Sequence, residues 1–286
     1  MNFVFAASAL AYPASYLDID PGARPCGMGS AFTALADDDN SAWFNPAGLT
    51  NMGINRFEGI GSIGFLPQGQ FHNYLSLSQQ LPPNSYLGFD VNGYGVGNIP
   101  GEDVSGFATS NLQDLELAFG CSFAYDFNYN LKAGLHGSFL HQDLAGTNAR
   151  GFGGADLGVL FIPSALYDFS LGACIRHLGG FLDWDGGLTE YLTPDLRVGA
   201  SQKFLDQAIV LSYDAEWLMK SDFAISNHAG FEVWIQKVVA LRGGWDKNNP
   251  TFGASFKISS YKLDYSYEFT SDGLGDFQRV AAEIGL

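Results

Sequence analysis

The sequence lacks the long apolar runs that a helical membrane protein needs. Although 47% of its 286 residues are hydrophobic, the apolar runs, such as 3–12 and 157–163, are short and are soon interrupted by glycine or charge. A helix that crosses a membrane needs about 20 consecutive apolar residues. Charge is also scarce, at 15% of residues, against roughly 25% in an ordinary soluble domain. These two shortages exclude a helical membrane bundle. The apolar residues are abundant but spread along the chain, as alternation of apolar and polar positions would spread them.

Basic residues, paired cysteines and metal-binding patterns are also missing. The net charge of −16 excludes nucleic acid as an expected partner, because phosphate binding needs a basic face. Three cysteines without a Cys-x-x-Cys pair predict neither a disulfide framework nor a zinc site. The five histidines show no ligand spacing. We therefore expect no metal, no cofactor and, since no catalytic Ser–His pair can be placed, no enzyme activity.

Two short patterns resemble ligand-binding loops but lack the residues that such loops need. Gly27-Met28-Gly29 follows no strand and has no lysine, so it is not a nucleotide loop. The run 37–39 begins like a calcium loop, yet Ala42 and Gly48 stand where its glycine and glutamate belong. Both patterns are better explained by packing and turns.

From residue 54 to the C-terminus, apolar and polar residues alternate with a period of two. In 261–269 the aromatic and leucine side chains occupy every odd position, while Lys262, Asp264, Ser266 and Glu268 occupy the even ones. Only a strand places residues i and i+2 on one face. Similar alternation is clear at 114–125, 196–201, 209–217 and 279–286.

This alternation fits a soluble sandwich or a membrane barrel, and three features favour the barrel. The apolar faces are rich in aromatics, the polar faces carry few charges of mixed sign, and many segments reach about 10 residues, the length of a tilted transmembrane strand. The sequence therefore predicts an all-β fold, an antiparallel transmembrane β-barrel of about fourteen strands. We expect these strands at 54–65, 70–81, 84–95, 113–126, 129–142, 151–162, 167–178, 192–203, 207–219, 225–236, 237–246, 250–258, 260–269 and 277–286, with longer loops near 96–112, 142–151, 179–191 and 270–276.

The region before the first strand differs from the rest. Residues 1–11 resemble the end of a signal peptide, with an apolar stretch and the Ala-x-Ala pattern Ala9-Leu10-Ala11. Residues 12–53 alternate little, and we expect a short helix at 30–36 and a turn at 45–49. The expected organisation is a signal remnant at 1–11, an N-terminal plug at 12–53 and a transmembrane barrel at 54–286.

The stretch 20–49 resembles a family motif. Its Gly-x-Arg-x-x-Gly-Met-Gly-x-Ala-Phe-x-Ala-x-Ala-Asp-Asp pattern at 22–38, followed by Trp-x-Asn-Pro-Ala-Gly-Leu at 43–49, resembles the PorV/PorQ family of outer-membrane proteins, which is related to the FadL hydrophobic-compound transporters. The resemblance covers nearly the whole mature chain and implies a fourteen-stranded barrel plugged by its N-terminal segment. Its plug motif would comprise Gly22, Arg24, Gly27, Gly29, Asp37, Asp38, Asn45, Pro46 and Gly48.

Alternation also predicts a network of charges inside the lumen. Isolated charge is costly in a narrow lumen, so these residues should pair with one another or with the plug. We expect Arg24 to meet a wall carboxylate such as Glu268 or Glu283, with periplasmic exposure as the alternative. The predicted inward charges are Arg176, Arg197, Asp214, Glu216, Arg242, Asp264, Glu268, Arg279 and Glu283, together with Lys203 and Lys257.

Three functions are compatible with such a barrel in the bacterial outer membrane. The resemblance favours a non-enzymatic shuttle that binds exported proteins in a type IX-like secretion or surface-attachment pathway, with a translocon or surface protein as partner. The first alternative is a FadL-like passive transporter of hydrophobic small molecules, and the second is a structural barrel that anchors a surface complex. In each case outer-membrane lipid surrounds the wall, and the candidate ligand or partner surface comprises Leu87, Phe89, Phe107, Phe181 and Leu182.

Overall fold

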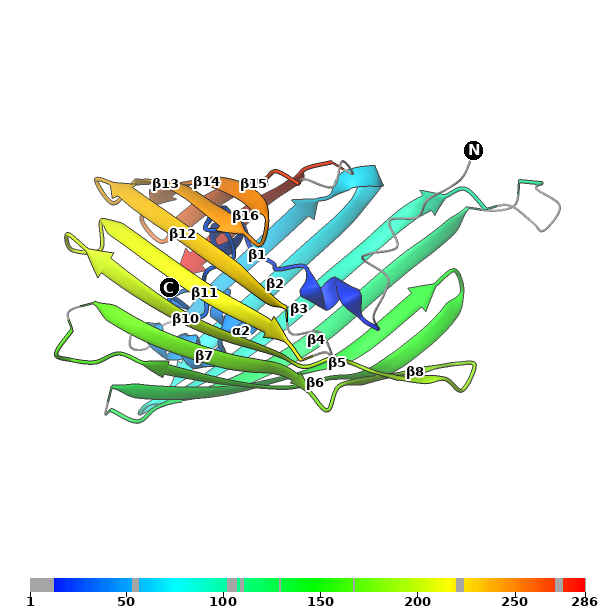
Figure 1. The fold of residues 1–286 in the computed structure, drawn as a ribbon, viewed down its shortest axis with the longest axis horizontal. Coiled ribbons are helices and arrows are strands. Elements are labelled where there is room, and N and C mark those ends of the chain that lie inside the picture. The colour runs from blue at the N-terminus through cyan, green and yellow to red at the C-terminus, as the bar shows by residue number, and fades with distance from the viewer. Residues whose placement is uncertain are drawn as a thin grey trace.

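The chain folds into a closed antiparallel β-barrel of fourteen wall strands around an N-terminal segment (Figure 1). The computed structural model describes residues 13–52, 57–101, 107–108, 111–128, 130–166, 168–219, 224–270 and 275–285. Pairing of β1 with β16 and of β5 with β6 completes the ring. The wall strands are β1 (Phe57–Phe65), β2 (Gln70–Leu81), β3 (Ser85–Ile99), β4 (Leu112–Asp126), β5 (Leu131–Leu144), β6 (Thr147–Phe161), β7 (Phe169–Leu178), β10 (Asp195–Phe204), β11 (Ile209–Leu218), β12 (Ile225–Ile235), β13 (Val239–Asp246), β14 (Asn249–Ile258), β15 (Tyr261–Glu268) and β16 (Phe277–Gly285).

The side chains of the wall are arranged as in a membrane barrel, with apolar residues outside. On β15, Tyr261 and Leu263 are more than half exposed, whereas Lys262 and Asp264 between them are buried. In the ring, each of the fourteen wall strands pairs with a neighbour on both sides, as the hydrocarbon core of a membrane demands. The alternation therefore predicted both the strands and the direction in which they face, and the fourteen-stranded barrel is confirmed.

The connections at the two ends of the barrel differ in length. At one end every link is short, from the β14–β15 turn at 259–260 to the β6–β7 link at 162–168. The other end carries the β3–β4 link at 100–111 and the β15–β16 link at 269–276. Bacterial barrels have short periplasmic turns and longer outer loops, so the second end is the outer one.

Two of the expected outer loops are in fact largely sheet. The predicted loop at 142–151 is wrong, because β5 and β6 are joined by the two-residue turn Ala145-Gly146. Both turn residues have positive φ, as a tight hairpin of matching twist requires. The predicted loop at 179–191 contains β8 (Phe181–Trp184) and β9 (Thr189–Tyr191), and β8 pairs with β6.

Residues 13–52, which we call the plug, lie inside the barrel and are mostly buried. The expected helix at 30–36 is wrong, because Ser30 and Ala36 have positive φ and bound a single turn closed by Ala36 N–H to Phe32 O. Phe32 and Thr33 donate their backbone N–H groups to Asp214 Oδ2 of the wall. The expected turn at 45–49 belongs to a 3-10 helix that begins at Pro46. The helical pieces of the chain are η1 (Ser15–Asp18), α1 (Ala23–Gly27), α2 (Ser41–Phe44), η2 (Pro46–Asn51) and, between β1 and β2, η3 (Pro67–Gly69).

Within the described residues, the helices are too short or too polar to cross a membrane. The expected signal remnant at 1–11 lies outside the described residues.

Candidate functional site

Near the outer end of the barrel, the strand pairing of the wall is interrupted between β7 and β8. β7 ends at Leu178, and the chain resumes pairing with β6 only at Phe181 of β8, while residues 192–194 separate β9 from β10. The chain bends at His177, whose φ of 61° is unusual for a residue with a side chain. We call this interruption, residues 177–180 and 192–194, the wall break.

A pocket lies between the wall break and the first turn of the plug. The plug contributes Ala14 and Leu17, and the wall contributes His177, Leu192 and Leu218. Five of the eight lining residues are apolar and three are polar. The pocket is completed by Pro13, Asp18 and Thr193.

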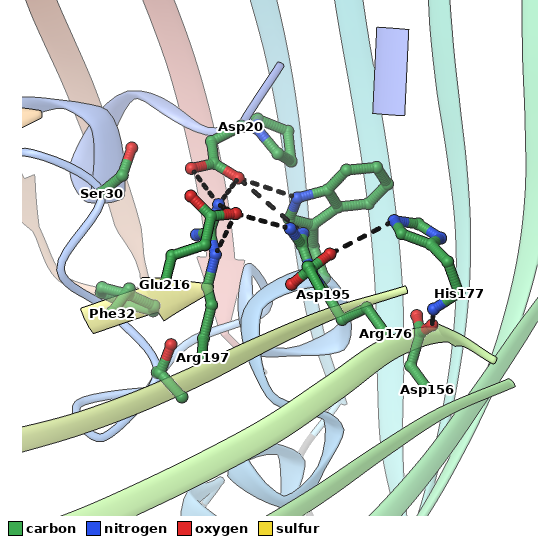
Figure 2. A network of polar contacts seen from close by, with 12 residues as sticks. Asp20, Ser30, Phe32, Asp156, Arg176, His177, Asp195, Arg197 and Glu216 are labelled. Carbon is green, nitrogen blue, oxygen red and sulfur yellow. Dashed lines mark hydrogen bonds and ion pairs between the residues drawn. The ribbon is translucent and has the colours of Figure 1, made fainter. Parts of the chain in front are cut away.

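A buried ion network joins the plug to the wall directly behind this pocket (Figure 2). Asp20 of the plug accepts from Arg197 Nη2, with Oδ2 at 3.0 Å, and Arg197 also donates to Glu216 Oε1 at 3.0 Å. Arg176 donates through Nε to Asp195 Oδ1 at 3.0 Å, beside the wall break. Both guanidinium groups are buried, so each depends on these carboxylates for charge compensation.

A second network holds α1 of the plug. Arg24 makes a two-pronged contact with Glu232, with Nε and Nη2 each 3.0 Å from a carboxylate oxygen. Its Nη1 reaches Asp37 and Asp38 within the plug, at 2.6 and 2.9 Å. Arg24 therefore meets a wall carboxylate, as expected, but the partner is Glu232 and not Glu268 or Glu283, because α1 lies so that the guanidinium faces β12.

The remaining predicted lumen charges fall into separate groups. Arg242 bridges Glu232 and Asp264, Arg279 pairs with Glu268 at 3.4 Å, and Glu283 pairs with Lys262 at 2.5 Å. Asp214 faces inward but accepts from plug backbone rather than from a cation. Lys203 reaches Asp37 at 2.7 Å. Lys257 lies opposite the inward Lys262 in the β14–β15 register, so it is on the inner face as expected, but near the end of β14 it is exposed.

The glycines of the plug motif lie where backbone meets backbone. A Cβ on Gly27 would lie 3.1 Å from Gly253 Cα, and one on Gly29 would lie 2.5 Å from Ala229 O. Within the plug, Gly22 adjoins Asn40 and Gly48 adjoins Ala36. Asn45 donates to Thr33 O and, across to the wall, to Val159 O at 2.9 and 3.0 Å. The motif thus lies at contacts within the plug and between plug and wall.

The wall supplies matching glycines that sequence reasoning did not single out. A Cβ on Gly134 would lie 2.3 Å from Pro46 C, and one on Gly158 would lie 2.1 Å from Asn45 Oδ1. Met28 lies similarly against Gly230 and Gly244. Alternation places these positions on the inner face, but it does not show which inner positions the plug approaches.

Asp37 and Asp39, two carboxyl groups of the plug, lie in environments that shift their pKa values in opposite directions. Burial alone would raise the pKa of Asp37, but Arg24 and Lys203 outweigh it and hold that pKa below its usual range. Asp39 is also buried and contacts Ser78 without a cation beside it, so burial raises its pKa to about 8. The plug therefore contains one carboxyl group that favours its ionised form and one that favours its neutral form.

Several polar groups of the site were not predicted. They are Asp20, Asp90, His136, Asp156, Asp195 and Glu232, all buried on the lumen side. Glu232, between the outward Phe231 and Val233, was visible in the alternation. The pairing of the others depends on which strands are neighbours and where the plug lies, and sequence spacing does not carry that information.

The predicted ligand or partner surface is not one surface. Leu87 and Phe89 lie on the outer face of β3, and Phe181 lies on that of β8, whereas Leu182 is buried within the core. Phe107 lies 71% exposed in the β3–β4 link. The structure therefore does not bring these five residues together.

Metal and disulfide chemistry receive no structural support from the described part of the chain. It contains no group of three or more His, Cys, Asp or Glu side chains that could hold a metal ion. Cys26, Cys121 and Cys174 are free thiols.

No protein-family model and no curated protein sequence matches this chain. Its fold resembles that of the toluene transporter TbuX from Ralstonia pickettii, with a TM-score of 0.64 and 16% identity over 93% of this chain and 97% of that one. It also resembles the CymD monoaromatic hydrocarbon channel, with a TM-score of 0.63 and 16% identity over 92% and 96% of the two chains. The deltaS2S3 mutant of the TodX monoaromatic hydrocarbon channel gives a TM-score of 0.64 at 13% identity over 93% and 98%.

At such identity the likeness shows the fold, and it identifies the chain as a bacterial outer-membrane β-barrel. These neighbours are a transporter and channels rather than enzymes. Membership of the PorV/PorQ family stays a prediction.

Proposed function

We propose that the chain is a passive transporter that carries small apolar molecules across the outer membrane. The observation that supports this most directly is the pocket between plug and wall break, to which Leu17, Leu192 and Leu218 contribute apolar side chains. The pocket is small, about 20 Å³, so it would have to widen to admit an aromatic solute. The pocket lies near the outer end, where a solute from outside would first meet the protein.

The interior of the barrel argues against a water-filled pore. Buried ion pairs and close glycine contacts fix the plug to the wall on several sides. A solute that needs continuous water, such as an ion or a sugar, would have to displace these contacts. Free diffusion of hydrophilic solutes is therefore not the function that this arrangement supports.

The fold comparisons favour the same class of substrate. A toluene transporter and two monoaromatic hydrocarbon channels share this barrel architecture. The FadL-like alternative thus has both a pocket and structural neighbours in its favour. The secretion shuttle and the structural anchor stay predictions, and co-purification with a translocon or an exported surface protein would support them instead.

Uptake by intact cells tests the proposal. A Gram-negative host whose lipopolysaccharide layer slows apolar solutes would express the chain, and uptake of labelled toluene would be followed. We expect faster uptake than with an empty vector, and no swelling of proteoliposomes in a sugar solution. Toluene uptake equal to that of the empty vector, or rapid sugar flux, would contradict the proposal.

A pair of threonine variants locates the route. Thr193 lines the pocket, so Thr193→Trp should fill it and reduce uptake about tenfold, the scale of a lost apolar contact of roughly 1.4 kcal/mol. Thr147 lies exposed at the start of β6, and Thr147→Trp makes the same substitution outside the pocket. Equal uptake by the two variants would show that this pocket is not on the route.

A further inference from the structure

The bend of the wall at His177 is held by contacts with β6. His177 has a left-handed backbone, which is unfavourable for a residue with a side chain. Opposite it, a Cβ on Gly154 would lie 2.4 Å from His177 C, so β6 leaves room for the bend. The register of β6 with β7 shifts between Ala155 and Leu157 at the same level. The bend is therefore built into both strands.

Asp156 of β6 fixes this bend directly. Its Oδ1 accepts the backbone N–H of His177 at 2.8 Å (Figure 2). His177 O accepts from Gly180 N at 3.2 Å, and Gly180 O accepts from Leu192 N at 3.0 Å. Three hydrogen bonds thus run from Asp156 through the bend to Leu192, which lines the pocket.

Asp156 is itself held by a buried histidine. Its Oδ2 lies 2.8 Å from His136 Nδ1, and His136 Nε2 lies 3.1 Å from Asp90 Oδ1. An ionised carboxylate only accepts hydrogen bonds, so an imidazole between two carboxylates donates from both nitrogens and is an imidazolium. The cation allows both buried aspartates to remain charged.

The neighbouring strand leaves space for this arrangement. A Cβ on Gly120 of β4 would lie 2.3 Å from His136 Nε2 and 2.4 Å from Asp90 Oδ1. Asp90 lies on β3, His136 on β5 and Asp156 on β6, and all three are buried. Among their described contacts, these three residues pair within the wall and not with the plug.

We infer that the Asp90–His136–Asp156 triad positions the wall break, and through it the lining of the transport pocket. This inference rests on the proposed function for its role in uptake, but not for its structural part. Asp156 is the positioning residue, because it alone of the three bonds the bend. His136 and Asp90 orient its carboxylate so that one oxygen stays directed at the His177 N–H.

The structural part is tested by a distance measurement that does not depend on transport. Spin labels would be attached at Thr147→Cys and Thr193→Cys in a Cys121→Ser background, since Cys121 is exposed whereas Cys26 and Cys174 are buried. In Asp156→Ala we expect the label-to-label distance distribution to broaden or shift. Asp156→Asn keeps an oxygen acceptor for the His177 N–H and should restore the original distribution.

Two further variants keep the test decisive if Asp156→Ala does not fold. His136→Leu leaves Asp156 in place but unoriented, and it should alter the distance distribution as Asp156→Ala does. Asp114→Ala removes another buried lumen-facing aspartate, on β4, and should leave the distribution unchanged. Folding of each variant is checked by heat-dependent migration on a gel.

The outcomes separate the inference from the proposed function. A folded His136→Leu or Asp156→Ala protein with an unchanged distance distribution would overturn the inference. The inference also expects folded Asp156→Ala to take up toluene about tenfold more slowly than Asp156→Asn, as the loss of a buried hydrogen bond implies. Altered distances, with uptake by the original protein no faster than that of the empty vector, would support the structural inference and refute the transport function.

Discussion

The two sides of the barrel hold the plug by different means. From β3 to β6, η2 of the plug lies against wall glycines such as Gly134 and Gly158, at distances that leave no room for a Cβ. On that side His136 pairs with Asp90 and Asp156 within the wall, whereas Lys132 of β5 donates to Asn51 Oδ1 and not to a carboxylate of the plug. From β10 to β16, the wall adds ion pairs that reach the plug directly, to Arg24 and Asp20.

This difference shows how one segment can be fixed in a lumen without a large apolar core. Close packing fixes position through repulsion, because interiors resist even one added methylene. Buried ion pairs fix orientation, because each charge needs its own partner once it is out of water. The plug needs both, since packing alone would tolerate small rotations of α1 and ion pairs alone would tolerate looser contact at η2.

The largest expected effect comes from reversing the charge of Arg24. Arg24→Glu would place a fourth carboxylate beside Glu232, Asp37 and Asp38, and breaking a buried pair costs about 3–5 kcal/mol. We expect the heat-resistant folded band on a gel to disappear at a clearly lower temperature.

Lys237→Glu is the matched control, because Lys237 pairs with Asp206 on the surface and is largely exposed. Exposed pairs contribute little, so its gel behaviour should equal that of the original protein. If both variants unfold alike, the ion pairs do not fix this side of the plug.

The glycine side is tested by adding a single methyl group. Gly134→Ala would place a Cβ 2.3 Å from Pro46 C, and overpacking of this kind costs about 1–3 kcal/mol. Gly61→Ala is the control, since a Cβ there would meet nothing within 4 Å. Urea unfolding followed by tryptophan fluorescence should show a loss for Gly134→Ala only, and equal midpoints would refute the close contact of η2.

The last expected effects come from Asp37 and Asp39, depend on pH and should have opposite signs. The raised pKa of Asp39, about 8, means that the folded chain binds a proton that the unfolded chain releases above about pH 4. Stability from this group is therefore lost as pH rises from about 4 to about 8. Asp39→Asn should stabilise the protein at pH 8 and should do so less at pH 5.

Asp37 gives the reverse dependence. Its lowered pKa contributes stability that is present above about pH 4 and is lost as pH falls below that value. Asp37→Asn should therefore destabilise the protein at neutral pH, and the difference should shrink in acid. Urea midpoints measured from about pH 2 to pH 8 check both variants, and effects of the same sign would contradict the assigned environments.

The pattern of side chains in the sequence determined the wall. Alternation at 261–269 placed Tyr261 and Leu263 outside and Lys262 and Asp264 inside, because strand geometry alone fixes which residues share a face. Most strand bounds agree within a few residues for the same reason. The misplaced loops at 142–151 and 179–191 show the limit, because a two-residue turn and the short strands β8 and β9 leave only a weak pattern.

The tertiary structure decided what the inward face does. Alternation could place Glu232 inside, and the motif could place Arg24 in the plug, but their pairing depends on how α1 is rotated within the closed ring. The pocket likewise combines Leu17 with Leu192 and Leu218, which are far apart along the chain. Alternation is a local property of strand geometry, whereas pairing and pocket shape arise only once the ring closes and the plug occupies it.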